Sequence, residues 1–118
     1  MHDRKTGALI RAATVAGAIM VGASRSKIEA VDTYAAHLGL GFQIIDDILD
    51  VEGTEEKLGK TAGKDAAAGK PTYPSIFGLE ESRRKAAQSI TQAKEALGTA
   101  GLSGRLGTIA DWVLSRTH

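Results

Sequence analysis

The residues that could do chemistry lie close together in the stretch 41–50, GFQIIDDILD. It places Asp46, Asp47 and Asp50 among strongly apolar residues, with no cation nearby in the sequence. On a helix with about 100° per residue, these aspartates share one arc with Gln43. The opposite arc is wholly apolar and consists of Ile44, Ile45, Ile48, Leu49 and Val51. A strand would point Asp46 and Asp47 to opposite faces and bury one of them unpaired, so the pattern predicts a helix with an acidic face.

Three carboxylates within little more than one helical turn repel one another unless a cation neutralises them. Hard oxygen ligands on one rigid face suit Mg²⁺, which keeps several waters and bridges a few carboxylates to substrate phosphates. A solvated helix end with exposed aspartates is the alternative interpretation. A calcium-binding EF-hand loop is excluded, because with Gly53 as the loop glycine the first ligand position would fall on Ile48.

The segment that follows is rich in glycine and carries four lysines: Lys57, Lys60, Lys64 and Lys70. Its GKT at 59–61 is similar to the end of a P-loop, but Gly53 stands one residue too far upstream. The segment also follows a predicted helix, whereas a P-loop follows a strand. It is either a flexible, solvated basic loop or a loop that closes over a phosphate held by the metal.

A third element is Lys5-Thr6-Gly7, at the predicted start of the first helix. The free amides and the dipole of a helix N-terminus attract anions, and Lys5 and Thr6 add a charge and a hydroxyl. Taken alone, this tripeptide is also compatible with an ordinary surface. Together, the acidic face, the lysine-rich segment and this tripeptide describe a clamp for a diphosphate.

Composition narrows the class of protein. A chain of 118 residues is enough for one small domain, and a net charge of +1 gives no strong field for nucleic acid or an acidic partner. The absence of cysteine excludes disulfides and thiolate metal sites and fits a reducing cytoplasm. The longest apolar run, residues 12–23, falls short of a bilayer span, so we expect a buried helix and no membrane span. We expect no signal peptide, since the run lacks a recognisable cleavage site.

The periodicity predicts four helices and no strand. The first covers about residues 4–22, and the second begins after Ser26 as N-cap and continues to about residue 52. The third covers about residues 72–97, with Pro74 in its first turn and Gly98 at its end. Its buried stripe should be Ala86, Ile90, Ala93 and Leu97. The fourth follows Ser103 and should bury Leu106, Ile109, Ala110, Val113 and Leu114.

Four blocks of the sequence, HDRKTGALIRAA, LGLGFQIIDDILDVEGTEEKLGKTAGKD, GKPTYPSIFGLEESRRKA and IADWVLSR, are similar to known enzymes. They resemble the C-terminal part of trans-isoprenyl (polyprenyl) diphosphate synthases. Within that family, the motifs resemble those of the farnesyl and geranylgeranyl diphosphate synthases most. The resemblance covers nearly the whole chain. It implies an all-α fold, in which residues 1–118 form the C-terminal helices of the isoprenoid synthase bundle around a deep cavity.

The same resemblance implies roles for particular residues. Asp46, Asp47 and Asp50 would be the second aspartate-rich motif, which holds Mg²⁺ on the allylic diphosphate. Substrate binding would fall to Lys5, Thr6, Gln43, Lys60 and Lys70. Of these, Lys5, Thr6 and Lys60 would also be catalytic, because they stabilise the charge that grows on the leaving diphosphate. The resulting carbocation would be attacked by the double bond of isopentenyl diphosphate, in a cavity that excludes water.

The sequence also departs from this family. Its remaining aspartates, Asp3, Asp32, Asp65 and Asp111, form no second cluster, whereas the family uses two aspartate-rich motifs. We therefore expect less than half of an enzyme, with the N-terminal portion and its first motif absent and no activity from this chain alone. A proteolytic fragment, a truncated form and a misplaced start would each explain such a chain.

Two other functions remain open. The chain could be a non-catalytic subunit or degenerate paralogue that binds another synthase chain. It could also be a terpene cyclase, although such an enzyme would not be expected to carry the KTG and LGK…GKD blocks. Because the first two predicted helices carry broad apolar faces, we expect a homo-oligomer, as in the homodimeric relatives, or association with the missing N-terminal portion.

Overall fold

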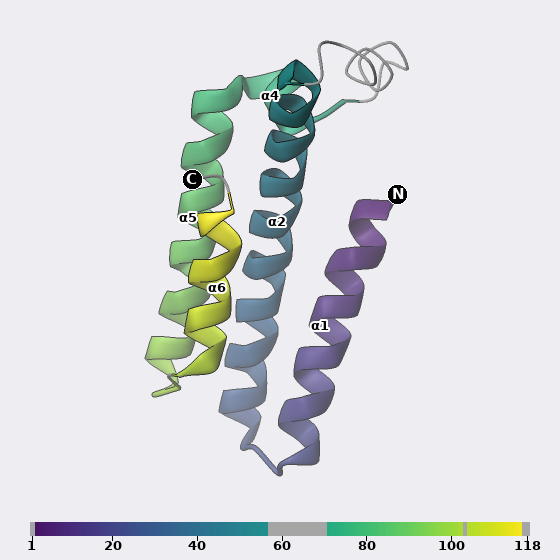
Figure 1. Cartoon of the computed structure of the whole chain (residues 1–118). Helices are drawn as coiled ribbons and strands as arrows, with labels where there is room; N and C mark the ends of the chain where they lie inside the picture. The colour runs from purple at the N-terminus through teal and green to yellow at the C-terminus, as the bar shows by residue number, and fades with distance from the viewer. Residues whose placement is uncertain (1, 57–70, 103, 117–118) are drawn as a thin grey trace.

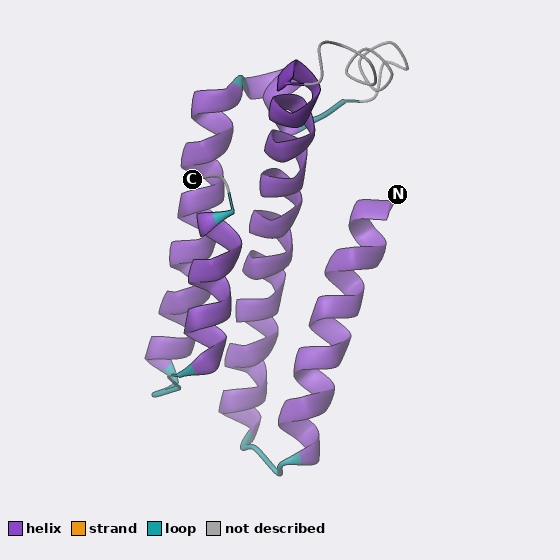
Figure 2. Ribbon diagram, viewed as in Figure 1, coloured by secondary structure: helices purple, strands orange, loops and turns teal. Residues whose placement is uncertain are grey.

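The computed structural model describes residues 2–56, 71–102 and 104–116, and every regular element in these ranges is a helix (Figure 2). The helices are α1 (His2–Met20), α2 (Arg25–Glu56), α4 (Tyr73–Phe77), α5 (Leu79–Thr99) and α6 (Arg105–Ser115). The predicted all-α class is therefore confirmed. None of the described helices is long and apolar enough to span a membrane.

The long helix α2 lies at the centre of an elongated molecule of 50 × 24 × 20 Å (Figure 1). On one side it packs against α5 and α6, and on the other side it packs against α1. The short helix α4 contacts both α2 and α5 near the end of α2. Among the described helices, α1 packs only against α2, so one side of α1 remains uncovered.

The core is formed by α2, α5 and α6. It contains Tyr34, Ala35, Leu38, Ile44, Ile45, Ile48, Ala86, Ile90, Ala93, Leu97, Ala110 and Val113. The apolar arc opposite the aspartates is thus buried, with Ile44, Ile45 and Ile48 at most 1% exposed. The predicted stripe of the third helix is also confirmed, since all four of its residues lie in this core.

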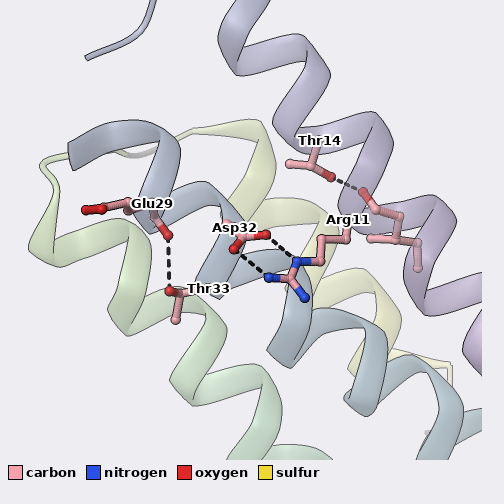
Figure 3. Close-up of polar contacts among 6 residues, drawn as sticks. Arg11, Thr14, Glu29, Asp32 and Thr33 are labelled. Carbon is pink, nitrogen blue, oxygen red and sulfur yellow. Dashed lines mark hydrogen bonds and ion pairs between the residues drawn. The ribbon is translucent and has the colours of Figure 1, made fainter. Parts of the chain in front are cut away.

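A charged contact joins α1 to α2. Arg11 reaches from α1 to Asp32 on α2 and donates from Nε and Nη2, the latter at 2.7 Å from Oδ2 (Figure 3). Hydrogen bonding to this guanidinium lowers the pKa of the Asp32 carboxyl. The side chain of Arg11 is 57% exposed and that of Asp32 is 35% exposed, so solvent screens the pair and its contribution to stability is small.

The second helix begins two residues earlier than predicted. Ser24, not Ser26, precedes it: the Lys27 N–H donates to Ser24 Oγ at 3.4 Å, and the Ile28 N–H donates to the Ser24 carbonyl at 2.9 Å. Both Ser24 and Ser26 have a side chain that can act as an N-cap. Ser24 is the N-cap, because its carbonyl accepts the first hydrogen bond of the helix, from the Ile28 N–H.

The predicted third helix is in fact two helices. Thr72 caps α4 in a reciprocal pair with Ser75, and the chain then breaks at Gly78, which has φ 85°. This left-handed region is costly for a residue with a Cβ atom, so Gly78 both ends α4 and starts α5.

The predicted end of this helix at Gly98 is wrong. The helix continues to Thr99, and the turn to positive φ falls at Gly101, with φ 72°. The Leu102 N–H donates to the Leu97 carbonyl at 2.8 Å, and the Gly101 N–H donates to the Gly98 carbonyl at 3.0 Å. This pair of bonds is a Schellman motif, which satisfies the last carbonyls of α5.

The last helix was predicted correctly except for one buried position. Ala110 and Val113 are buried and Leu106 and Leu114 are half-buried, but Ile109 is 45% exposed. The face of α6 that meets α2 and α5 is therefore narrower than the sequence suggests. The Tyr34 hydroxyl fixes this helix to α2 by donating to the Leu106 carbonyl at 2.7 Å. Burial raises the pKa of Tyr34 to about 12.

Candidate active site

The acidic face of α2 is positioned by the burial of its opposite side. Because Ile44, Ile45 and Ile48 lie in the core, the aspartates point away from α5. Asp46 and Asp47 are half-buried and Asp50 is exposed. The predicted separation of an apolar arc from an acidic arc is thus present in the fold.

Asp47 accepts hydrogen bonds from two different helices. Its Oδ1 accepts a hydrogen bond from the Gln43 side-chain amide at 3.0 Å, one turn earlier on α2. Its Oδ2 accepts from the backbone N–H of Tyr73 at 3.1 Å. Tyr73 is the first residue of α4, where a backbone N–H has no acceptor within the helix, so the carboxylate supplies one. Asp47 thereby holds α4 against the acidic face.

Asp46 has a different partner. Its Oδ1 accepts from Nη2 of Arg116 at 3.1 Å, and Arg116 is the residue that caps the C-terminus of α6. The guanidinium also lies 5.1 Å from the ring centre of Phe42 and 5.6 Å from that of Trp112. The sequence shows no cation near the aspartates, but the fold brings one from 70 residues away.

A groove lies between α1, α2 and α4, beside the acidic face. It has a volume of about 580 Å³ and is lined by Gly7, Ala8, Arg11, Ala35, Ala36, Gly39, Leu40, Gln43 and Tyr73. Gly7, the glycine of the KTG tripeptide, therefore lines the same groove as Gln43 and Tyr73, the two residues that donate hydrogen bonds to Asp47. Its wall is formed mainly by alanines, glycines and a leucine, which suits an apolar chain better than a polar ligand.

The close approach of α1 and α2 at this groove depends on two glycines. A Cβ atom added to Gly39 would lie 3.3 Å from the Cα of Gly7. Lys5 and Thr6 directly precede that contact; Lys5 is exposed and Thr6 is half-buried. The structure thus places the predicted Lys5-Thr6 pair at the end of α1 that borders the groove. Lys60 and Lys70 lie outside the described residues.

Two groups that belong to this site are not evident from the sequence. Tyr73 acts through its backbone N–H, which no side-chain motif reveals, although Pro74 and Thr72 do mark the helix start that makes this N–H available. Arg116 belongs to the block IADWVLSR, but nothing in that block connects it to an aspartate.

The donor set can be compared with the needs of Mg²⁺. Across the described ranges, no group of three or more histidine, aspartate or glutamate side chains converges as a ready-made metal site. Mg²⁺ does not require one, because it binds through one or two carboxylates and completes its shell with water and phosphate oxygens. Asp46 and Asp47 are half-buried carboxylates on adjacent residues, and this donor chemistry fits such a site.

Comparison with known proteins gives a consistent result. The family model for polyprenyl synthetase matches residues 1–100. Over the whole chain, the sequence is 47% identical to dimethylallyltranstransferase from Fischerella ambigua, of which it covers 34%. It is 42% identical to farnesyl diphosphate synthase from Bacillus subtilis and 44% identical to geranylgeranyl diphosphate synthase from Cyanophora paradoxa. Both alignments include the whole of this chain, and the chain spans 40% of the length of each of these two relatives.

Proposed function

The chain belongs to the polyprenyl synthetase family, and we propose that it forms the allylic-diphosphate side of a trans-prenyltransferase site. In this proposal, the complete protein condenses an allylic diphosphate with isopentenyl diphosphate. The names of the relatives support prenyl transfer as the reaction class, and the product length is left open by their variety.

One observation carries the proposal: Gln43 and Tyr73 both line the apolar groove and both donate a hydrogen bond to Asp47. An acidic group with fixed orientation therefore stands at the edge of a cavity suited to a hydrocarbon chain. This arrangement supports a pose in which the charged end of an allylic diphosphate lies at the carboxylates and its isoprenoid tail lies along the groove.

Each group has a definite task in this proposal. Asp46 and Asp47, with Asp50, would hold Mg²⁺, which would supply a Lewis acid to neutralise charge on the leaving diphosphate. Gln43 orients the carboxylate of Asp47. Lys5, Thr6, Lys60 and Lys70 bind diphosphate oxygens directly, as a point charge or a hydroxyl can do.

The groove has the complementary task of lining the isoprenoid tail with unreactive groups. Ala8, Ala35, Ala36 and Leu40 carry no polar side-chain atoms, so a reactive cation held beside them meets no nucleophile from this wall. The aspartates remain at the edge of the groove, where they bind metal and phosphate.

The proposal is tested in a full-length protein that contains these 118 residues. Asp46→Ala and Asp47→Ala should each lower kcat by at least about 10²-fold, because each removes stabilisation of charge that develops in the transition state. Lys60→Ala should weaken binding of the allylic diphosphate. Lys94→Ala is the matched control, since Lys94 on α5 pairs with Asp111 on α6 at 2.8 Å. Unchanged kcat in both aspartate variants would contradict the proposal.

We also propose that the 118-residue chain is inactive by itself. It contains one aspartate cluster, whereas condensation in this family is expected to need two. The purified chain should form no prenyl product from an allylic diphosphate and isopentenyl diphosphate. Steady product formation that scales with this polypeptide would overturn the expectation.

A second candidate function is that of a non-catalytic subunit. It is favoured by the uncovered side of α1 and the residue after it, where Leu9 is 70% exposed, Met20 85% and Val21 82%. Large apolar side chains in such numbers on one helix are typical of a surface that another protein covers. In that role the occupant that we propose is another synthase chain, and the test is whether this chain forms a stable complex with a full-length prenyl synthase.

A further inference from the structure

The contact between Arg116 and Asp46 differs in charge from the two hydrogen bonds that Gln43 and Tyr73 donate to Asp47. Two of the contacts of Asp47 come from neutral N–H groups, on Gln43 and Tyr73, and such groups remain compatible with a cation on the same carboxylate. Asp46 is bonded by a positive charge. The guanidinium and a metal ion are both cations, so they compete for the same oxygen atoms.

The surroundings of Arg116 favour a contact that can be released. Its side chain is 26% exposed and that of Asp46 is 38% exposed, so water reaches both partners. Ion pairs of this kind are weak, because solvent screens them. The rings of Phe42 and Trp112 give the guanidinium a second set of attractive contacts that do not depend on Asp46.

We propose that Arg116 is a built-in competitor of the divalent cation at Asp46. It neutralises this carboxylate when no metal is bound, and metal binding displaces the guanidinium from Asp46, which removes one of the contacts that join the C-terminal end of α6 to α2. The inference rests on the proposed function, since it takes Asp46 to be a metal ligand. It adds that metal binding and the docking of the end of α6 oppose each other.

The coupling must act in both directions, because linked equilibria are reciprocal. If the metal weakens the contact of Arg116, then removal of Arg116 must strengthen binding of the metal. The gain in Mg²⁺ affinity on removal of Arg116 should match the strength of a partly exposed ion pair. This corresponds to roughly a two- to fivefold lower Kd for Mg²⁺.

The chain carries its own reporter for this movement. Trp112 is the one tryptophan in the sequence, and the Arg116 guanidinium lies 5.6 Å from its ring centre. Displacement of the guanidinium changes the charge beside the indole, so the emission of Trp112 should respond to Mg²⁺.

The experiment titrates the whole chain with magnesium chloride alone, by calorimetry and by Trp112 emission. Arg116→Gln should bind Mg²⁺ roughly two- to fivefold more tightly and should lose most of the emission change. Arg105→Gln is the matched control, because it removes the same charge from the exposed start of α6 and should behave as the unaltered chain does. Asp46→Asn should abolish the emission change.

The outcomes distinguish the metal site itself from the competition between Arg116 and the metal. Equal Kd values for Mg²⁺ in the unaltered chain and in Arg116→Gln, with an unchanged emission of Trp112, would overturn the competition and leave the metal site in place. No binding of Mg²⁺ by any of the four chains would overturn the metal site and the competition together. If Arg116→Gln does not fold, the unaltered chain still decides: binding of Mg²⁺ without an emission change contradicts the proposal.

Discussion

Gly39 on α2 meets the backbone of Gly7 on α1, because a Cβ atom at position 39 would lie 3.3 Å from the Cα of Gly7. Such a distance is too short for an ordinary carbon contact, and the atom that must give way is part of a backbone. Since α1 packs only against α2 among the described helices, the strain can be relieved by a shift of α1. The groove between the two helices would change shape as a result.

Gly39→Ala should therefore act on the groove more than on the global fold. Amide hydrogen exchange in α1 should become faster, and in a full-length protein the allylic substrate should bind more weakly. Gly17→Ala is the control, because a Cβ atom there meets nothing within 4 Å and alanine favours the helix by about 0.5–1 kcal/mol. Unaltered exchange in α1 of the Gly39→Ala variant would contradict the expected shift.

Gly41→Ala should differ, because its Cβ atom would lie 2.9 Å from Cδ1 of Ile90 in the core between α2 and α5. Overpacking of this kind costs about 1–3 kcal/mol, which exceeds the gain in helix propensity. The free energy of unfolding in urea should fall accordingly. A variant as stable as the unaltered chain would show that the core accommodates the extra methyl group.

The two glycines near the end of α5 should respond in opposite ways. Gly98 is helical and a Cβ atom there meets nothing within 4 Å, so Gly98→Ala should raise the free energy of unfolding by about 0.5–1 kcal/mol. Gly101 has φ 72°, where a residue with a Cβ atom is strained, so Gly101→Ala should lower it by about 1–2 kcal/mol. Denaturant unfolding of both variants measures the difference. The reverse order of stability would place the end of α5 at Gly98.

The buried phenol of Tyr34 predicts a loss of stability at alkaline pH. Its pKa is raised from 10.0 to about 12 by burial, so the folded state retains the proton that the unfolded state loses. The contribution is fully present below about pH 10 and is lost as the pH rises through about 12. The free energy of unfolding should decrease over this window. In Tyr34→Phe the decrease should be smaller, and Tyr73→Phe serves as the control tyrosine.

The uncovered side of α1 predicts self-association. Leu9, Ile19, Met20 and Val21 are 58% to 85% exposed, and their burial would remove apolar surface from water. Multi-angle light scattering should detect species larger than the 12.3 kDa chain. The double variant Ile19→Gln with Met20→Gln should shift the equilibrium toward the monomer, whereas Gln88→Ala on the exposed side of α5 should not. A stable monomer that binds no hydrophobic dye would be evidence against this surface being an interface.

The sequence was sufficient for features that repeat along one helix. The apolar arc of Ile44, Ile45 and Ile48 and the stripe of α5 follow from the helical period alone, and both are buried. The acidic face follows from the same period. These features were predictable because burial of one side of a helix fixes the direction of every side chain on it.

The partners of the aspartates could not be predicted in the same way. Arg116 lies 70 residues from Asp46, and Tyr73 lies 26 residues from Asp47. Such contacts depend on how helices pack, which no local period encodes. Helix ends were uncertain for a related reason: Gly78, Gly98 and Gly101 can all adopt positive φ, and packing of the following segment decides which of them does.

The bond from Tyr34 to Leu106 has a consequence for the substitutions that the chain can tolerate. The acceptor is a main-chain carbonyl, which every amino acid possesses, whereas the donor is a phenol that only tyrosine supplies at that length. Position 106 is therefore free to drift among apolar residues of similar size without loss of the bond. Position 34 is more constrained, because phenylalanine would fill the space but would lose the bond that the phenol adds to this helical carbonyl. The two ends of one hydrogen bond thus place different demands on the side chain at each position.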